Sequence, residues 1–428
     1  MHFITTVIAL LFYIQTFQCL NFHENSRLNF FDTDLLRYSA EDRPGNVVIS
    51  PASVKSTLAM LLEGANGVTK EEIRSALRLV PNKEEAREQL NLYLNALKSN
   101  SSNVVIENAN AVFISADRLT VRKDFEQTLR SIYLTQVFKA DFRDPVGTAV
   151  SINQWVNSTT RGLIPTVVEA SLIDPRSNIL FTNALYFKST WKFSFDPRQT
   201  TAGCFHSQGG CRTVSMMRLQ AELNYAYVDN LRAHAVELPY EGGRYSMILL
   251  VPLDVDGWRS VIRDLPYMSL PQIVQLMNPE ELELAVPKFV VDFSEDMARP
   301  LSKMRVNTLF TPSCNLSGIF EGVSSQVSSI HHKVFISVDE VGTVAAAASA
   351  AVVIPLISDG VTLTVDRPFV FFIRDRAGGL TLFEGKIEEP TAFVEKAVPT
   401  MIPTKVPAKA HQQVQAQQKQ SFFSRFLG

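Results

Sequence analysis

Apolar and polar residues in the first hundred positions follow patterns that predict one short strand and three helices. The strand covers residues 46–50, where two valines and an isoleucine lie together. Pro51 then opens a helix with apolar residues at helical spacing, and Gly64 ends it. A second helix is expected to begin with Thr69 as its N-cap, and a third covers residues 82–98.

Further along the chain, runs of β-branched and aromatic residues predict mainly strands. Helices therefore dominate the first third of the chain and strands the remainder, with neither a regular βαβ alternation nor an internal repeat. This order of elements is typical of the α+β class. The clearest strand-like runs are residues 178–187, 246–251, 282–291 and 369–373.

Residues 333–365 contain two strand-like runs separated by a longer linker than a hairpin requires. Residues 333–340 alternate apolar and polar side chains, and so do residues 361–365. About twenty alanine-rich residues connect them, whereas hairpin loops have about two to five. Alanine favours a helix, but the β-branched run 352–354 and Pro355 oppose a long one. Because small side chains can slide between existing strands, we predict an exposed loop that is able to become a strand.

An almost unbroken apolar run at the amino terminus, residues 4–17, predicts a secretory signal peptide. The run is too short to cross about 30 Å of hydrocarbon comfortably, and no second candidate span follows. A buried N-terminal strand is disfavoured for so apolar a start. We expect residues 1–19 to be removed, with cleavage near Cys19, and the mature protein to be secreted into the extracellular space.

Three cysteines would remain after this cleavage. Cys204 and Cys211 flank a Gly-Gly turn, so they are candidates for a disulfide across a hairpin in an oxidising compartment. A zinc site formed by this pair and His206 is the alternative, but the spacing matches no structural zinc pattern. Cys314 is left as a free thiol. We therefore expect a disulfide and no metal site.

Three Asn-x-Ser/Thr sequons are candidate glycosylation sites in a secreted chain, at Asn100, Asn157 and Asn315. Asn315 is the weakest candidate, because its neighbours Leu316 and Ile319 indicate partial burial.

Composition narrows the possible classes of function. The chain has 41 Lys and Arg against 43 Asp and Glu, a formal charge of −2, and 46% of its residues are hydrophobic. These values exclude wholesale disorder and argue against a dedicated nucleic-acid binder, which carries a basic excess. No zinc-protease, nucleophile-elbow, phosphate-loop or Cys-x-x-Cys motif occurs, and the adjacent His331 and His332 would point to opposite faces of a strand. We therefore expect a protein that is not an enzyme and that uses no cofactor.

The composition changes after Pro390. Residues 391–428 contain three prolines spaced by four and six glutamines between Gln412 and Gln420, and five basic residues against one acidic residue give a charge of +4. Such a segment cannot bury enough apolar surface to order itself, so we predict a disordered basic tail. Its last residues, 421–428, form a small apolar hook, for which a docking peptide or a membrane-surface contact is the alternative interpretation.

Several motifs, in order along the chain, resemble those of the serpin family, and the resemblance covers about residues 26–390. Length alone would predict two or three domains, but the order of the motifs assigns residues 20–390 to a single serpin domain. The chain departs from the family at Glu384, where an apolar residue is common, and in the tail after Pro390. The matching segments are 46–51 with 58–65, 152–157, 181–187 with Trp191, 236–240, 287–289, 366–369 and 382–385.

The resemblance implies a fold and a mechanism. Serpins have helices packed around a large mixed central β-sheet A, smaller sheets B and C, and an exposed reactive-centre loop, here at about residues 340–360. A target serine protease cleaves this loop, becomes attached as an acyl-enzyme, and stays in a covalent complex because the loop inserts into sheet A. We expect a monomer. Heparin binding is not indicated, because acidic residues balance the basic ones in residues 82–98.

The proximal hinge of such a loop inserts first and therefore needs small side chains. Alternate residues of a strand face inward, and those positions are small in this chain. Inhibitors of the family usually carry glutamate where this chain has Val341, and often where it has Val344, so a non-inhibitory carrier or binding protein is the alternative. The residues that match the hinge are Glu340, Gly342, Thr343, Ala345, Ala346, Ala347 and Ala348.

Two registers are possible for the scissile bond. Counting from Glu340 by the family spacing gives Leu356–Ile357, whereas counting back from Pro368 gives Ile357–Ser358. We favour Leu356, because its unbranched β-carbon enters a deep primary pocket more easily than isoleucine does. A leucine at this position predicts chymotrypsin-like or elastase-like targets, with papain-like cysteine proteases as a further possible class.

The family's shutter, a buried hydrogen-bonded cluster that controls opening of the central sheet, is matched by Ser50, Ser53, Asn183 and His332. Trp191 is expected near the point where the loop inserts. The resemblance therefore gives His332 a role other than metal binding.

Overall fold

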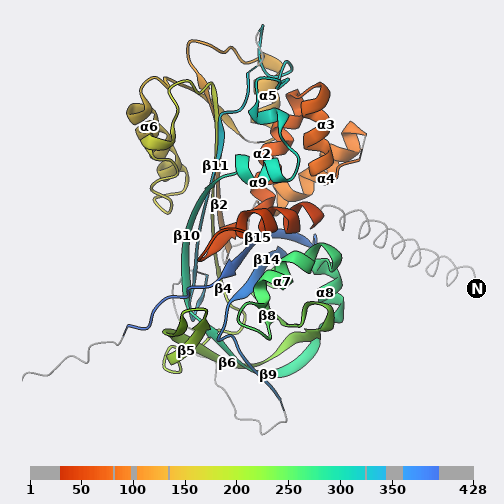
Figure 1. Cartoon of the computed structure of the whole chain (residues 1–428), viewed down its shortest axis with the longest axis vertical. Helices are drawn as coiled ribbons and strands as arrows, with labels where there is room; N and C mark the ends of the chain where they lie inside the picture. The colour runs from red at the N-terminus through yellow and green to blue at the C-terminus, as the bar shows by residue number, and fades with distance from the viewer. Residues whose placement is uncertain are drawn as a thin grey trace, which may run out of the picture. The chain divides into compact units, whose positions relative to one another are not determined.

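The computed structural model of the chain contains two β-sheets with helices packed against both (Figure 1). This architecture agrees with the predicted α+β class. The predicted signal peptide, most of the reactive-centre loop, Asn100 and nearly all of the tail lie outside the part of the chain that the structure describes. The described residues are 29–80, 82–97, 104–133, 135–322, 325–343 and 360–394.

Helix α2 (Pro51–Gly64) has the bounds that its proline and glycine predict. The side chain of Ser50, its N-cap, accepts a hydrogen bond from the backbone of Ser53. The remaining helices are residues 29–40, α3 (Gly67–Ala76), α4 (Lys83–Ala96), α5 (Lys123–Ser131), α6 (Pro145–Thr159), α7 (Gly257–Asp264), α8 (Leu270–Leu276) and α9 (Ala298–Lys303).

The prediction that Thr69 caps the second of these helices is wrong. Helix α3 begins at Gly67, and its N-cap is Asn66, three residues before Thr69. The hydroxyl of Thr69 instead accepts a hydrogen bond from the backbone N–H of Asn315, at 3.0 Å. A long-range contact therefore uses the side chain that the local pattern assigned to capping.

The six-stranded sheet has the order β10-β11-β12-β4-β2-β3. It is mixed, because β4 runs parallel to β11 and β2 parallel to β3, while the other pairs are antiparallel. This is the predicted central sheet A. Its strands are β2 (Val104–Ser115), β3 (Gln136–Ala140), β4 (Ile179–Thr190), β10 (Phe289–Asp296), β11 (Ser329–Val338) and β12 (Gly342–Thr343).

The second sheet has nine strands, in the order β1-β15-β14-β8-β7-β6-β9-β13, with β5 also paired to β6. The predicted sheets B and C are joined in it, because the 19-residue strand β6 (Gly210–Val228) pairs with members of both. The other strands are β1 (Val47–Ile49), β5 (Thr201–Ser207), β7 (Ala233–Pro239), β8 (Tyr245–Pro252), β9 (Asn278–Pro287), β13 (Val361–Thr364), β14 (Phe369–Asp375) and β15 (Leu380–Ile387).

The prediction of one strand over residues 282–291 is also wrong. The chain turns at Lys288, so that β9 belongs to the nine-stranded sheet and β10 to the six-stranded sheet. The apolar run did not reveal this corner, although burial changes there from continuous over residues 284–287 to alternating in β10.

Apolar side chains cover both faces of the central sheet. On β4, Leu180 and Ala184 belong to the cluster that includes Ile152 and Val156 of α6, whereas Phe181 and Leu185 belong to the main core. Figure 1 shows α6 on one side of this sheet and α2 on the other. The alternation expected of a strand thus places two separate cores on its two faces.

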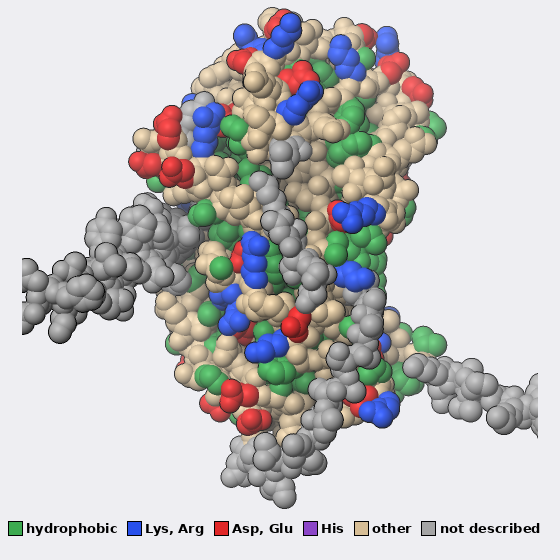
Figure 2. Space-filling model, turned by 180° about the vertical axis from the view of Figure 1, so that it is seen from behind, with side chains coloured by type: hydrophobic (Ala, Val, Ile, Leu, Met, Phe, Trp, Pro, Cys, Tyr) green, Lys and Arg blue, Asp and Glu red, His purple; other side chains and the backbone are tan. Residues whose placement is uncertain are grey.

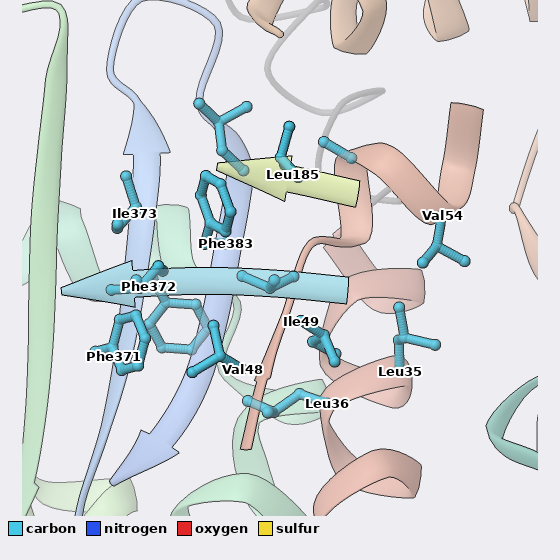
Figure 3. Close-up of a cluster of buried hydrophobic side chains, with 14 of the residues drawn as sticks. Leu35, Leu36, Val48, Ile49, Val54, Leu185, Phe371, Phe372, Ile373 and Phe383 are labelled. Carbon is cyan, nitrogen blue, oxygen red and sulfur yellow. The ribbon is translucent and has the colours of Figure 1, made fainter. Parts of the chain in front are cut away.

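The main core fills the space between the nine-stranded sheet, α2 and the helix over residues 29–40. Figure 3 shows Leu35, Val48, Ile49, Phe372 and Phe383 among its members. Among the described residues, no helix is long and apolar enough to cross a bilayer.

Candidate functional site

The candidate site lies in the middle of the central sheet, between the parallel strands β4 and β11. These two strands pair directly where residues 180–186 of β4 face residues 329–335 of β11. Beyond that stretch, β12 lies between them, with Thr343 opposite Ser189 of β4 and Val338 of β11. The first strand residues of the predicted loop therefore occupy the position that a new central strand would take.

Gly342 is required by this close approach. A β-carbon at this position would collide with the carbonyl oxygen of Ser189 and would lie 2.6 Å from the Cα of Thr190. The preceding turn is held by Asp339, whose Oδ1 accepts hydrogen bonds from the N–H groups of Val341 (3.0 Å) and Gly342 (3.2 Å). The chain therefore turns at Asp339 and has no side chain at Gly342, where it enters the sheet.

Glu340 anchors the root of the loop through two side chains. The Nζ of Lys288 lies 2.6 Å from its Oε2, and the hydroxyl of Thr200 donates to its Oε1 at 2.7 Å. Burial raises the pKa of Glu340, but these hydrogen bonds outweigh burial and lower that pKa below its ordinary value. The carboxylate is therefore charged and paired.

Trp191 and Tyr240 form an aromatic wall beside the loop root. Their rings stack with centroids 4.4 Å apart, and the indole Nε1–H of Trp191 donates to the carbonyl of Asp339 at 3.0 Å. The hydroxyl of Tyr240 lies 2.8 Å from that of Thr343 in a fully buried contact. Burial raises the pKa of Tyr240, so the phenol stays neutral. Thr343 is therefore held by a hydrogen bond between two uncharged hydroxyl groups.

The residues predicted to form the shutter lie together under the centre of the sheet. The Nε2 of His332 accepts a hydrogen bond from the backbone N–H of Ser50 at 3.0 Å. Its Nδ1 therefore carries the proton and donates to the Oδ1 of Asn183 at 2.6 Å. The Nδ2 of Asn183 bonds to the hydroxyl of Ser53 and, at 2.6 Å, to the Oδ1 of Asn110.

The shutter network is neutral and links α2 to four strands, β2, β4, β11 and β15. Burial lowers the pKa of His332 to about 3, so its ring is uncharged at neutral pH. The hydroxyl of Ser50 donates to the carbonyl of Leu382 on β15 at 2.6 Å. Because β4 and β11 are joined through this network, separating them breaks hydrogen bonds but separates no charges.

Sequence reasoning missed four residues of the site: Asn110, Thr200, Tyr240 and Lys288. Asn110 had a detectable signal, because a polar side chain recurs at every second position, Asn108 and Asn110, within an apolar strand. Tyr240 and Lys288 lie in segments that resemble the family, and Thr200 does not. The sequence pattern assigned none of the three a role, since their partners are about 50 to 140 residues away along the chain.

The remaining predicted residues that the structure describes lie away from this site. Cys204 and Cys211 are joined in a disulfide on the β5–β6 hairpin. Cys314 is buried, and burial raises the pKa of its thiol to about 11. Asn157 is exposed on α6, whereas Asn315 is partly buried. Among the described residues, no group of three His, Cys, Asp or Glu side chains is placed to hold a metal ion.

Comparison with known proteins finds one matching family model, described as Serpin (serine protease inhibitor), over residues 26–390. A relative named leukocyte elastase inhibitor, from Sus scrofa, is 30% identical, and the match covers 84% of this chain and 97% of that protein. The crystal structure of Serpin48 from the insect Tenebrio molitor is similar, with a TM-score of 0.77, 29% identity, and coverage of 85% of this chain and 97% of that one. Human thyroxine-binding globulin with bound thyroxine has the same fold, with a TM-score of 0.78, 24% identity, and coverage of 86% and 98%.

Proposed function

Because the chain belongs to the serpin family, we propose that it is a suicide-substrate inhibitor of chymotrypsin-like or elastase-like serine proteases. One observation carries the proposal: Thr343 is already paired between β4 and β11, at the start of the track that a cleaved loop would follow. The similarity of this chain to a leukocyte elastase inhibitor supports the proposed class of target protease. In this role the protein is consumed by a protease and is not itself an enzyme.

The residues that follow Thr343 have side chains small enough for rapid insertion. The hydroxyl of Thr343 points into the packed interior at Tyr240. In an inserted strand, alternation would place Ala345, Ala347 and Ser349 on the same side. A large or charged side chain at these positions would have to displace core atoms or bury a charge. About sixteen inserted residues at roughly 3.3 Å each would move an attached protease on the order of 50 Å.

The proposed scissile bond is Leu356–Ile357, with Ile357–Ser358 as the alternative register. The protease serine Oγ attacks the carbonyl carbon of Leu356, and the protease histidine passes the serine proton to the departing amine of Ile357. The resulting ester persists, because insertion pulls the protease away from the geometry that hydrolysis needs. Relaxation of a kinetically trapped fold supplies the driving force.

Mixing the purified chain with chymotrypsin or elastase tests this proposal. We expect a covalent complex that survives SDS. Clean cleavage of the loop by both enzymes without any complex would overturn the proposal. Ala345→Arg should turn the inhibitor into a substrate, because the arginine would face inward. Ala346→Arg, which places the same side chain on the outward face, is the matched control and should keep inhibition.

A non-inhibitory carrier or binding protein is the second candidate function. Val341 and Val344 stand where inhibitors usually carry glutamate, and thyroxine-binding globulin shares the fold. The melting temperature before and after loop cleavage separates the two candidates. A large rise indicates that the cleaved loop inserts and supports the inhibitor, whereas an unchanged melting temperature supports the carrier.

We also propose that residues 1–19 are a cleaved signal peptide, that residues 20–390 form one serpin domain, and that the mature monomer is secreted with a disordered tail. The disulfide and the exposed sequon at Asn157 support passage through an oxidising, glycosylating compartment. Protein secreted by an expressing cell should begin near residue 20 and lose mass on glycosidase treatment. A chain that begins at Met1 and carries no glycan would contradict this.

We propose no role for heparin or nucleic acid. On the face shown in Figure 2, the described Lys and Arg side chains lie among Asp and Glu side chains and do not form a continuous basic surface. On α4, Arg87 is already paired with Glu63, with Nε 2.7 Å from Oε1. Elution from a heparin column at low salt is expected, and retention at high salt would contradict this.

A further inference from the structure

Lys288 is a junction between the two sheets and the root of the loop. Its backbone N–H donates to the carbonyl of Ser215 on β6 at 2.9 Å, and its carbonyl accepts from the N–H of Thr391 at 3.0 Å. Its ammonium group lies 2.6 Å from the carboxylate of Glu340. Since β12 begins at Gly342, two residues after Glu340, the position of Lys288 bears directly on the hinge.

The segment that reaches Lys288, Glu388–Phe393, is here called the strap. Asn46 holds its beginning through three hydrogen bonds. The Oδ1 of Asn46 accepts from the N–H groups of Glu388 and Glu389, both at 2.9 Å, and its Nδ2 donates to the carbonyl of Glu389 at 2.7 Å. The strap therefore leaves β15 in a fixed direction.

The far end of the strap pairs with β6. Ala392 forms an antiparallel bridge with Val214, and the N–H of Phe393 donates to the carbonyl of Thr213 at 3.1 Å. On this edge, β6 pairs with β9 only from Met216 onward, so the strap covers backbone groups that β9 leaves open. The strap thus continues past residue 390, where composition alone places the start of the tail.

We propose that the strap is a positioning device for the hinge: by fixing the backbone of Lys288, it keeps the ammonium group on Glu340 and directs the cleaved loop into the sheet. This inference rests on the proposed inhibitory function. Without the strap, the root of the loop is held less firmly, insertion slows, and more of the acyl-enzyme is hydrolysed before the protease is trapped.

Two truncations separate the strap from the rest of the tail. Ending the chain after Pro390 removes the bond from Thr391 to Lys288, whereas ending it after Val394 keeps every strap contact described above. We expect the first truncation to raise the moles of inhibitor consumed per mole of chymotrypsin inactivated about five-fold, the size of effect of one hydrogen bond. The second should match the full chain. Equal values for both truncations would overturn the proposal.

A single substitution tests the same contact in the full-length chain. Thr391→Pro removes the donor to Lys288 and deletes no residues. It should raise inhibitor consumption by the same factor, but not in a Lys288→Met background, where the link to Glu340 is already lost. An equal rise in both backgrounds would show that the strap acts elsewhere, and this variant also decides the matter if the shorter truncation does not fold.

Failure of the proposed function can be distinguished from failure of the strap. If the full chain forms no covalent complex with any protease tested, the inhibitory proposal fails. The strap is then tested by the rate at which a labelled synthetic peptide with the sequence of residues 342–355 incorporates into the central sheet. A difference between the two truncations supports the strap, and equal rates contradict it.

Discussion

Helix α2 contributes to two buried polar clusters, and the two differ in charge. The shutter is neutral, and each of its members forms a hydrogen bond within it. The second cluster, here called the ionic cluster, lies between α2 and the nine-stranded sheet. The shutter contains Ser50, Ser53, Asn183 and His332, and the ionic cluster contains Asp32, Lys55, Tyr93 and Glu384.

The ionic cluster contains one ammonium group and two carboxyl groups in the core. The Nζ of Lys55 lies 2.6 Å from the Oδ1 of Asp32 and 2.6 Å from the hydroxyl of Tyr93. Glu384 is 0% exposed, and neither of its carboxyl oxygens accepts a hydrogen bond from any described residue. Burial raises the pKa of Glu384 well above its ordinary value and that of Asp32 to about 6. Glu384 is therefore protonated in the folded protein.

The two clusters beside α2 make contributions to stability that change with pH in opposite directions. The pKa of His332 is lower in the folded state, so its contribution to stability is full above 6.5 and falls as the pH drops toward about 3. The pKa of Glu384 is higher in the folded state, so its contribution is full below 4.5 and falls as the pH rises through the folded value. The shutter is thus sensitive to acid and the ionic cluster to alkali.

The largest effect is expected from Lys55→Met. This change leaves the carboxylate of Asp32 buried without a cation, at a cost of about 3–5 kcal/mol in the free energy of unfolding. Urea denaturation at pH 7 measures it. Adding Asp32→Leu to Lys55→Met should recover much of the loss, because the uncompensated charge is removed. A loss below about 1 kcal/mol for the single variant would contradict an ionic Asp32–Lys55 pair.

The next largest effect is expected from Asn183→Ala, which leaves His332, Ser53 and Asn110 with unmet hydrogen bonds. We expect a loss of about 2–3 kcal/mol in the free energy of unfolding, together with faster peptide insertion between β4 and β11. Asn157→Ala, an exposed substitution on α6, is the control and should change stability by less than about 0.5 kcal/mol. If the two variants unfold alike, the shutter does not hold the sheet closed.

The pH dependence should separate the two clusters. Between pH 5 and 7, the contribution of Glu384 should make the free energy of unfolding of the wild type fall as the pH rises, by at most about 1.4 kcal/mol per pH unit. The contribution of His332 should make the same free energy rise with pH, up to the same limit. Glu384→Gln should remove the first slope and His332→Gln the second. Urea midpoints at several pH values measure both, and unchanged slopes would refute the assigned protonation states.

The smallest effects separate two neighbours on one strand. The Oδ1 of Asn110 accepts a hydrogen bond from the Nδ2 of Asn183 at 2.6 Å. The Oδ1 of Asn108 accepts one from the hydroxyl of Ser53 at 3.4 Å. Asn110→Ala should cost about 1 kcal/mol in the free energy of unfolding and Asn108→Ala less than about 0.5 kcal/mol, since the second hydrogen bond is long. Thermal unfolding of the pair provides the measurement, and the reverse order would contradict this ranking.

Elements set by local pattern could be predicted from the sequence. Helix α2 has its expected bounds because Pro51 and Gly64 act locally, and strand β8 agrees closely with the run 246–251. The members of the shutter could be named because the motifs resemble a known family, and the structure brings them together.

Features that depend on distant partners could not be predicted. The corner at Lys288 lies within an apolar run, and Thr69 bonds to a residue far along the chain. Glu384 differs from the family pattern, but only the fold places it near Lys55, 329 positions earlier. Local periodicity contains no information about such pairs.

The central claim, that a cleaved loop inserts and traps its protease, is tested most directly by mass spectrometry of the reaction with chymotrypsin. The account predicts a covalent complex and a carboxy-terminal peptide that begins at Ile357, or at Ser358 in the alternative register. Release of this peptide with no covalent complex and with fully active chymotrypsin would contradict the claim.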